Sequence, residues 1–530
     1  MFVKNLEEMI AYNKGSTVKS LEQSYLNLKK SVDNYLAGNI SATDLKKVSS
    51  LLGIYQQRNG LFMLRIRITG GHISVSKLQK VAEIMDEYNV EFAHITSRQA
   101  LQLQDVAPAD IDPILKKLTA NGMPFRGGGS NTYRNILASS DSAIAADETF
   151  DVLPYAQALN DFLFTYDKAV ELPRKLKFGF SSEADDSIKA IVQDLGFIAK
   201  RQNGEKGFEV YAGGGMGKES ILGVRVFNFL PENQFAKCAK AVTDLFYDHG
   251  DRTNRSQGRL RFVHKRLGKD KFIELFQEYF KKSTVDVNVT ANQDIEGEVK
   301  SLQQFEFNLP DHKHYSQWAE YAVSNTKLGD DIISLRLFVP YGNLKAGHIR
   351  NIANLAEKCG LSFVRLTQGM DILFPLIHKS ALPVIFDSFN HELKDLDLSL
   401  LSFKGHLTSC IGPKVCTVGI ADAPALSDII TATLDKYFTE YPDKKPKEVL
   451  SILQEFKISG CPNACSGHIV SKMGLQGMKK RVNETLTEGA FLYTGGKAVQ
   501  NDARLASSDK EFLHKNKISQ AVKIGEIQGV

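Results

Sequence analysis

An internal duplication is the feature that most constrains the fold of this chain. Residues 62–103 align without a gap with residues 333–374, at an offset of 271 that pairs Arg65 with Arg336. In both segments, apolar and polar residues alternate, a turn follows, the apolar residues then recur with a helical period, and the alternation returns. This pattern predicts strand, turn, amphipathic helix and strand in each copy.

A second pair of aligned blocks follows the first in the same order. Residues 173–180 align with 455–462, and residues 207–214 align with 489–496, both at an offset of 282. Two pairs in one order predict a duplicated two-part unit, since a period this long excludes a solenoid. We therefore expect a pseudo-twofold α+β architecture with a ligand site where its domains meet.

The segments between the blocks set the expected domain boundaries. Residues 1–55 lie outside the repeat and read as helices, with Ser41 or Thr43 as a helix cap. Polar joints divide the rest of the chain. The expected domains are a helical extension at 1–55, the two parts of the first copy at 56–125 and 126–300, and those of the second copy at 325–395 and 400–530.

Composition excludes several classes of protein. The chain has 530 residues, of which 43% are hydrophobic and 24% charged, and its net charge is +5. No apolar run is long enough to predict a membrane span, and residues 1–15 do not resemble a secretory signal. We therefore expect a cytoplasmic protein whose thiols are reduced. The net charge is too small to predict nucleic-acid binding, and suits an anionic ligand or an acidic partner.

Four of the six cysteines form two pairs between turn residues. Cys410 and Cys416 give C-x5-C, and Cys461 and Cys465 give C-x3-C. Four thiols in one region of a reduced protein predict a metal site or cluster, although zinc usually takes tighter C-x2-C pairs. Four unrelated buried cysteines are the alternative. Two further cysteines, Cys238 and Cys359, lie in helical patterns and are expected in the core.

Basic residues recur on single faces of predicted strands. Alternation places Arg65 and Arg67 on one face, and Lys175 and Lys177 on another. A solvated face explains each pair equally well. Arg134 follows a glycine-rich turn and by itself reads as a surface residue.

The motif C-x5-C followed by G-C-P-N-x-C resembles the assimilatory sulfite and nitrite reductases, which couple sirohaem to a [4Fe-4S] cluster. The resemblance covers residues 50–500, including the duplication, and is closest to ferredoxin-type sulfite reductases. It implies ferredoxin-like half-domains plus two sirohaem/[4Fe-4S]-binding α+β domains. It also implies that Asn463 touches a sirohaem carboxylate, that Cys465 bridges the cluster to the sirohaem iron, and that the cluster ligands are Cys410, Cys416, Cys461 and Cys465.

The same resemblance assigns the basic residues. An M-L-R-x-R strand, an N-x-x-R-N turn and a P-R-K-x-K segment match the family's anion-binding catalytic residues, here Arg65, Arg134, Lys175 and Lys177. The carboxylates of sirohaem need polar partners, which the resemblance places at Arg67, Thr96, Arg98, Gln102, Arg259 and Arg261. His94 stands where relatives can have Arg, so that contact is not carried over.

The two copies differ where the site is expected. Arg98 of the first copy corresponds to Gly369 of the second. One reading is that the first copy supplies the anion-binding residues and the second supplies the cluster. The other reading is that Gly369 only satisfies a turn.

The resemblance implies six-electron reduction of sulfite to sulfide. Lys177 favours sulfite, because nitrite reductases tend to carry Asn at that position. The segment 135–142 lacks a cysteine that many sulfite reductases have there, so reduction of nitrite to ammonia stays open. The glycine stretches 126–130 and 213–217 match no dinucleotide motif, which predicts that electrons come from ferredoxin or a separate flavoprotein. A non-catalytic protein with a four-cysteine zinc site is a remote alternative, as is a cluster-only electron carrier.

Overall fold

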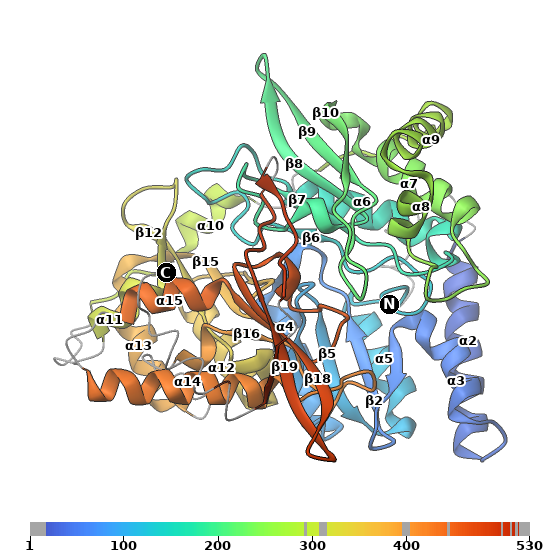
Figure 1. Ribbon diagram of the computed structural model, residues 1–530. Helices are drawn as coiled ribbons and strands as arrows, with labels where there is room; N and C mark the ends of the chain where they lie inside the picture. The colour runs from blue at the N-terminus through green and yellow to red at the C-terminus, as the bar shows by residue number, and fades with distance from the viewer. Residues whose placement is uncertain are drawn as a thin grey trace.

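The computed structural model describes residues 17–290, 294–306, 315–394, 403–441, 446–499, 502–508, 511–514 and 518. Strands of these residues form four five-stranded sheets, two from each copy of the repeat. Two long hairpins make the pseudo-twofold relation visible, because they point to opposite ends of the molecule in Figure 1. They are β8 (Leu195–Gln202) with β9 (Glu205–Ala212), and β18 (Met473–Val482) with β19 (Thr485–Thr494).

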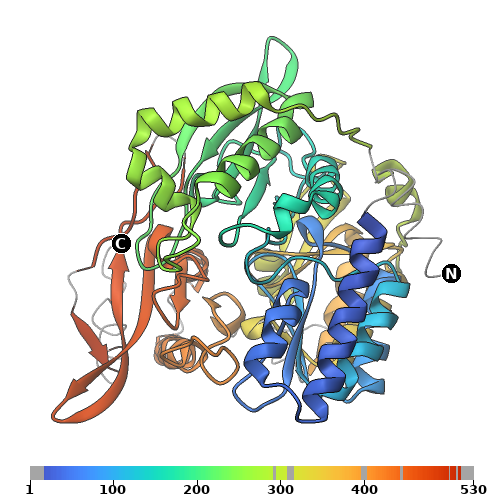
Figure 2. The same ribbon diagram turned by 90° about the vertical axis from the view of Figure 1, so that its right-hand side faces the viewer.

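Two helices precede the repeat, α2 (Thr17–Leu36) and α3 (Ala42–Ser49). Ser41 caps α3, because its hydroxyl accepts from the Asp44 backbone N–H at 3.2 Å while the Asp44 carboxylate accepts from the Ser41 backbone N–H. Ser41, rather than Thr43, is therefore the cap. Figure 2 shows both helices, in dark blue, beside the first half-domain. The segment 1–15 and the end of the last expected domain, 519–530, lie outside the described residues.

The first aligned blocks fold as the gapless alignment predicts. Each copy contains strand, turn, short strand, helix and two strands, and an outer strand joins each sheet, β1 (Ile54–Gln56) or β11 (Val323–Asn325). The elements of the first copy are β2 (Phe62–Ile66), β3 (His72–Ser74), α4 (Val75–Glu87), β4 (Ala93–Ile95) and β5 (Leu101–Val106). Those of the second are β12 (Ile332–Leu337), β13 (Asn343–Leu344), α12 (Ala346–Lys358), β14 (Phe363–Leu366) and β15 (Ile372–His378).

The two half-domains exchange their short strands. β3 of the first copy pairs with β14 of the second, and β13 of the second pairs with β4 of the first. The helices α4 and α12 contact each other through Gln79, whose amide donates to Glu357 at 3.1 Å, and through an ion pair between Arg350 and Asp86. One hydrophobic core is continuous through both half-domains. The exchange fixes the two copies against each other, which positions residues of one beside residues of the other.

The second aligned blocks each form a sheet that begins with parallel strands and ends in the long hairpin. The sheet orders are β10-β9-β8-β7-β6 and β16-β17-β18-β19-β20. The remaining strands are β6 (Leu137–Ala138), β7 (Phe178–Ser181), β10 (Val224–Pro231), β16 (Thr408–Ser409), β17 (Phe456–Ser459) and β20 (Phe512–His514).

The alignment of residues 173–180 with 455–462 is wrong by four positions. Phe178 pairs with Leu195 in the first copy, and Phe456 pairs with Met473 in the second, so the offset is 278 rather than 282 at these strands. The offset reaches 282 only where β9 and β19 end, because β18 and β19 are each two residues longer than β8 and β9. Lys177 therefore corresponds to Glu455, and not to the residues that lead into Cys461.

Helices cover the outer faces of these sheets. Helices α6, α7 and α9 share an aromatic-rich core with β7–β10, and α14 and α15 pack on the second-copy sheet. Figure 2 shows α7–α9, in light green, across one end of the molecule. The helices whose bounds have not yet been given are α5 (Ile111–Ala120), α6 (Leu153–Thr165), α7 (Phe235–His249), α8 (Leu260–Leu267), α9 (Lys269–Lys282), α10 (Ile295–Ser301), α11 (Tyr315–Ala322), α13 (Leu382–His391), α14 (Ala423–Glu440) and α15 (Pro446–Gln454). No helix of the described residues is long and apolar enough to cross a membrane.

Candidate active site

One face of the first half-domain sheet carries a row of polar side chains. Gln102 on β5 lies opposite Arg65 on β2 and opposite His94 on β4, so all three share a face. The strand alternates as the sequence predicts: Arg65 and Arg67 are half-buried, whereas the residues between and beside them are buried. Burial lowers the pKa of Arg65 and lowers that of His94 to about 4, so His94 is neutral near pH 7.

Arg67 turns its guanidinium away from this row. Its Nη1 donates to the Arg126 carbonyl at 2.7 Å and its Nη2 donates to Asn160 Oδ1 at 2.6 Å. The guanidinium carbon also lies 4.1 Å from the centre of the Tyr133 ring. Fewer Arg67 donors are therefore free for a ligand, and the predicted sirohaem contact stays a prediction.

The glycine-rich loop before β6 folds around the Arg134 guanidinium. Nη1 donates to the carbonyls of Gly129 and Thr132 at 2.9 and 2.7 Å, and Nη2 donates to the Ser130 carbonyl at 2.8 Å. Gly127 and Gly128 both have positive φ, which lets the loop pass close to Arg65. Arg134 is thus held rigidly beside the row on the first sheet.

Lys175 and Lys177 lie at the entrance to β7. Both are half-buried while the intervening Leu176 is buried, so the two ammonium groups share a face as predicted. Burial, and then the charges of Arg259 and Arg134, lower the pKa of Lys175 to about 7. Burial and the charges of Arg98 and Arg259 lower the pKa of Lys177 well below its ordinary value.

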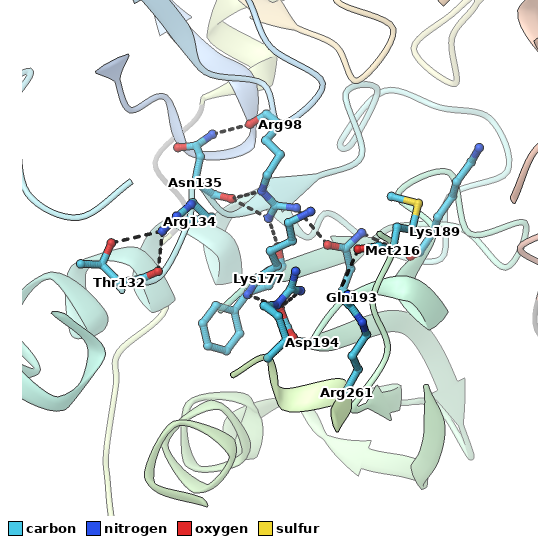
Figure 3. A network of polar contacts seen from close by, with 12 residues as sticks. Arg98, Thr132, Arg134, Asn135, Lys177, Lys189, Gln193, Asp194, Met216 and Arg261 are labelled. Carbon is cyan, nitrogen blue, oxygen red and sulfur yellow. Dashed lines mark hydrogen bonds and ion pairs between the residues drawn. The ribbon is translucent and has the colours of Figure 1, made fainter. Parts of the chain in front are cut away.

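The turn after β4 presents Arg98 to the same region (Figure 3). Thr96 shapes this turn, because its hydroxyl accepts from the backbone N–H groups of Arg98 and Ala100. The Arg98 guanidinium donates to Gln193 Oε1 at 2.9 Å and to backbone carbonyls of Asn135 and Phe178. Gly369 makes the same turn in the second copy without a positive φ, but a Cβ there would lie 2.6 Å from Asp371 Oδ2. The glycine therefore avoids a steric clash rather than a strained backbone.

Arg259 and Arg261 stand at the start of α8, where both are almost fully buried. Arg259 forms an ion pair with Asp194 at 2.8 Å, and Arg261 donates to the Met216 carbonyl at 3.2 Å. Within the described residues, the buried Nε groups of Arg65, Arg67, Arg259 and Arg261 have no acceptor. Such donors are costly unless a ligand satisfies them.

The four thiols of the second copy lie within electrostatic range of one another, and Cys465 also acts on the cations. Burial is the first cause that raises the pKa of Cys410, Cys416 and Cys461, and the neighbouring Cys465 thiol raises all three further. In the part of the chain that the structure describes, no three cysteine, histidine or carboxylate side chains can hold one metal ion. Three of the four thiols lie within electrostatic range of Cys465, and four thiols gathered in one place suit a metal site or a cluster.

The structure brings most of the predicted residues into one region. Cys465 acts electrostatically on Arg65, Lys175 and Lys177, so the thiol expected to bridge the two cofactors lies beside the cations. Asn463 is exposed near this point, and its amide donates to Cys461 Sγ at 3.5 Å. Arg67, Arg98 and Arg134 all donate to acceptors of the protein, so their predicted ligand contacts stay predictions.

Three further residues of this region, Tyr55, Asn135 and Asp194, are not among those predicted from the sequence. The Tyr55 hydroxyl accepts from the Ser130 backbone N–H and lies within electrostatic range of Arg65 and Arg134. Asn135 joins the first sheet to the glycine loop by donating to the Ile68 and Arg98 carbonyls. Asp194 is fully buried beside Lys177. Asn135 could have been predicted as a site residue, because it is the last residue of the N-x-x-R-N turn.

Comparisons with known proteins agree with this arrangement. The family model described as the nitrite and sulphite reductase 4Fe-4S domain matches residues 129–284 and 402–528. The model described as the nitrite/sulfite reductase ferredoxin-like half domain matches residues 55–121 and 327–391. The chain belongs to the nitrite and sulfite reductase family. It is an oxidoreductase of that family, and the expected duplicated ferredoxin-like half-domains are confirmed.

Relatives of both names are similar to the chain. It is 26% identical to a ferredoxin–nitrite reductase of Synechococcus elongatus, covering 84% of this chain and 82% of the relative. It is 25% identical to the sulfite reductase [NADPH] hemoprotein beta-component of Acidithiobacillus ferrooxidans, covering 94% and 89%. The solved structure of Mycobacterium tuberculosis NirA, 21% identical, has the same fold with a TM-score of 0.76 and coverage of 98% and 92%.

Family membership bears out the two expected cofactors, sirohaem and a [4Fe-4S] cluster. The residues present fit both groups. The buried Nε groups of Arg65, Arg67, Arg259 and Arg261, which lack an acceptor, suit the carboxylates of sirohaem, and four thiols that act electrostatically on one another suit the cluster. The site thus combines donors from the first copy with thiols from the second.

Proposed function

We propose that this protein reduces sulfite to sulfide, taking up six electrons, at a centre built from the cations of one copy and the thiols of the other. Lys177 carries the proposal. It lies beside Lys175, Arg98 and Arg259, and by the family resemblance nitrite reductases tend to have Asn at its position. Sulfite is larger than nitrite and can bear two negative charges, so an additional cation matches it.

The residues divide the work of binding and proton delivery. Arg65 and Arg134 bind the oxyanion by their charge and by the guanidinium N–H groups that the protein leaves free. Lys175 and Lys177 donate protons, and their lowered pKa makes them stronger acids than free lysine. When bound, sirohaem coupled to the cluster would supply the electrons for the reduction.

Reduction of nitrite to ammonia is the second candidate. Further relatives, from Arabidopsis thaliana and Leptolyngbya laminosa, are also named ferredoxin–nitrite reductases. The reaction also takes up six electrons, so the same centre serves both substrates. In either case we propose ferredoxin or a separate flavoprotein as the electron donor, and the cytoplasm as the location, where thiols stay reduced.

Product analysis of the purified holoenzyme tests the proposal. Methyl viologen reduced by dithionite supplies electrons, and sulfide and ammonium are measured with sulfite or nitrite as substrate. We expect a higher kcat/KM for sulfite. A higher kcat/KM for nitrite would mean that nitrite is the substrate of the same centre. No turnover of either anion would reject both candidate reactions.

A further inference from the structure

The cationic region contains one buried carboxylate that the proposed reaction does not use. Asp194 is fully buried, and its Oδ2 accepts from the Lys177 backbone N–H at 2.9 Å and from Arg259 Nη2 at 2.8 Å. Among the ion pairs of the described residues, only Asp194–Arg259 has both side chains less than a tenth exposed. Figure 3 shows Asp194 between the Lys177 segment and the start of α8.

The surroundings of Asp194 are otherwise positive. Lys175, Lys177, Arg98, Arg134 and Arg259 act on one another as like charges, which destabilises them as a group. The Asp194 carboxylate opposes this repulsion at Arg98 and at Arg261. The carboxylate is only partly satisfied, because its Oδ1 has no hydrogen-bond partner among the described residues, and a buried ion pair of this kind is weak evidence for a role in stability alone.

Asp194 also sits at a junction of the backbone. It directly precedes β8, whose Leu195 N–H donates to the Lys177 carbonyl at 3.1 Å, and its own carbonyl accepts from the Gly213 N–H at 2.9 Å. The carboxylate therefore links the lysine segment, the hairpin and α8. A shift of Asp194 would move Lys177 and Arg259 together.

We infer that Asp194 is the positioning residue and counter-ion of this cationic region: its carboxylate orients Arg259 and the Lys177 segment toward the bound anion. As a positioning residue, Asp194 acts through Arg259 and the Lys177 segment, which are its hydrogen-bond donors. The inference on substrate turnover rests on the proposed function, whereas the counter-ion role can be measured without it.

Three variants separate charge from geometry. Asp194→Asn removes the charge and keeps the shape, and Asp194→Glu keeps the charge and moves it by one methylene. Glu183→Gln is the matched control, because Glu183 is also buried in the first-copy domain. Although burial raises its pKa, hydrogen bonds from Ser182, Ser187 and Ser139 bring that pKa below its ordinary value, so this carboxylate is ionised too.

The thermal midpoint of each purified holoenzyme is measured from about 0.01 M to about 1 M NaCl, because chloride that enters the cationic region would replace the lost negative charge and stabilise the folded state. Asp194→Asn should lower the midpoint most at low salt and recover as salt rises, while Glu183→Gln shows a loss independent of salt. Asp194→Glu should keep the wild-type salt response, yet turn over the substrate anion at least about tenfold more slowly at unchanged sirohaem content.

An equal salt response in Asp194→Asn and Glu183→Gln would overturn the counter-ion role. Wild-type turnover by Asp194→Glu would overturn the positioning role. If the wild-type protein reduces neither anion, the proposed function fails, but the salt response still decides whether Asp194 is the counter-ion.

Discussion

The Ser97 hydroxyl donates a hydrogen bond of 2.8 Å to the backbone carbonyl of Cys465. Ser97 belongs to the turn that presents Arg98, and Cys465 lies in the second copy. A similar link reaches the other cysteine loop, where Arg58 Nη2 donates to the carbonyls of Thr417 and Gly419 at 3.2 and 3.0 Å. The first half-domain therefore holds both thiol loops.

Ser97→Ala should loosen the loop of Cys465. Loss of one hydrogen bond costs about 1 kcal/mol, which corresponds to roughly a fivefold faster loss of iron to a chelator. Iron release from the purified protein at constant temperature measures this. Ser97→Thr keeps the hydroxyl and should retain iron as the wild type does. Release at the wild-type rate from Ser97→Ala would remove the Ser97 link from the account.

The first copy shows why it holds no second cluster. Strand register places Ser139, Glu183 and Ser187 at the positions equivalent to Cys410, Cys461 and Cys465. The Ser139 hydroxyl donates to Glu183 at 2.9 Å and lies 3.0 Å from the Ser187 hydroxyl. These side chains satisfy one another, so the pseudo-twofold counterpart of the thiol site is closed by hydrogen bonds.

Lys177→Asn should change substrate preference. We expect kcat/KM for sulfite to fall about 100-fold, in the range of a lost general acid, and kcat/KM for nitrite to fall less than about tenfold. Steady-state rates with reduced methyl viologen measure both. Lys457→Asn is the control. Burial also lowers the pKa of Lys457 to about 7, but strand register makes Lys457 equivalent to Gly179 of the first copy and not to Lys177. Equal losses on both anions would take Lys177 out of the selectivity argument.

Asp371→Asn should stabilise the protein in a pH-dependent way. Burial raises the pKa of Asp371 to about 7, so the folded state holds this proton more tightly than the unfolded state does. The resulting penalty is small near pH 4 and grows as pH rises to 7. At pH 8 the variant should gain about 3–4 kcal/mol in the free energy of unfolding, and only about 1 kcal/mol at pH 4.5. Urea unfolding at both pH values tests this, and a gain of equal size at both would contradict it.

Local patterns determined much of the fold in advance. The alternation around Arg65 and the helical period of α4 recur in both copies, so each half-domain was predictable from its own residues. The exchange of β3 and β13 was not, because short strands with similar sequences give no sign of which copy they pair with. The four-residue error at Phe456 had a related cause: the extra length lies in the hairpin, beyond the motif that was aligned.

The candidate site divides in the same way. Cysteines and basic residues in dense motifs could be identified, whereas Asp194 stands alone in its segment and gains meaning only when folding places Arg259 against it. Arg67 shows the converse, since strand alternation fixes its face but not the direction of its guanidinium. Side-chain hydrogen bonding between distant segments decides such cases.

The central claim is that thiols of the second copy and cations of the first build one sirohaem and [4Fe-4S] centre. Optical absorption and metal content of the protein, produced with iron and sirohaem supplied, test it most directly. We expect sirohaem absorption bands near the red end of the visible spectrum. We also expect about five iron atoms per chain, four in the cluster and one in the sirohaem. Cys410→Ser should lose the cluster iron. A colourless protein that binds one zinc ion per chain would contradict the claim.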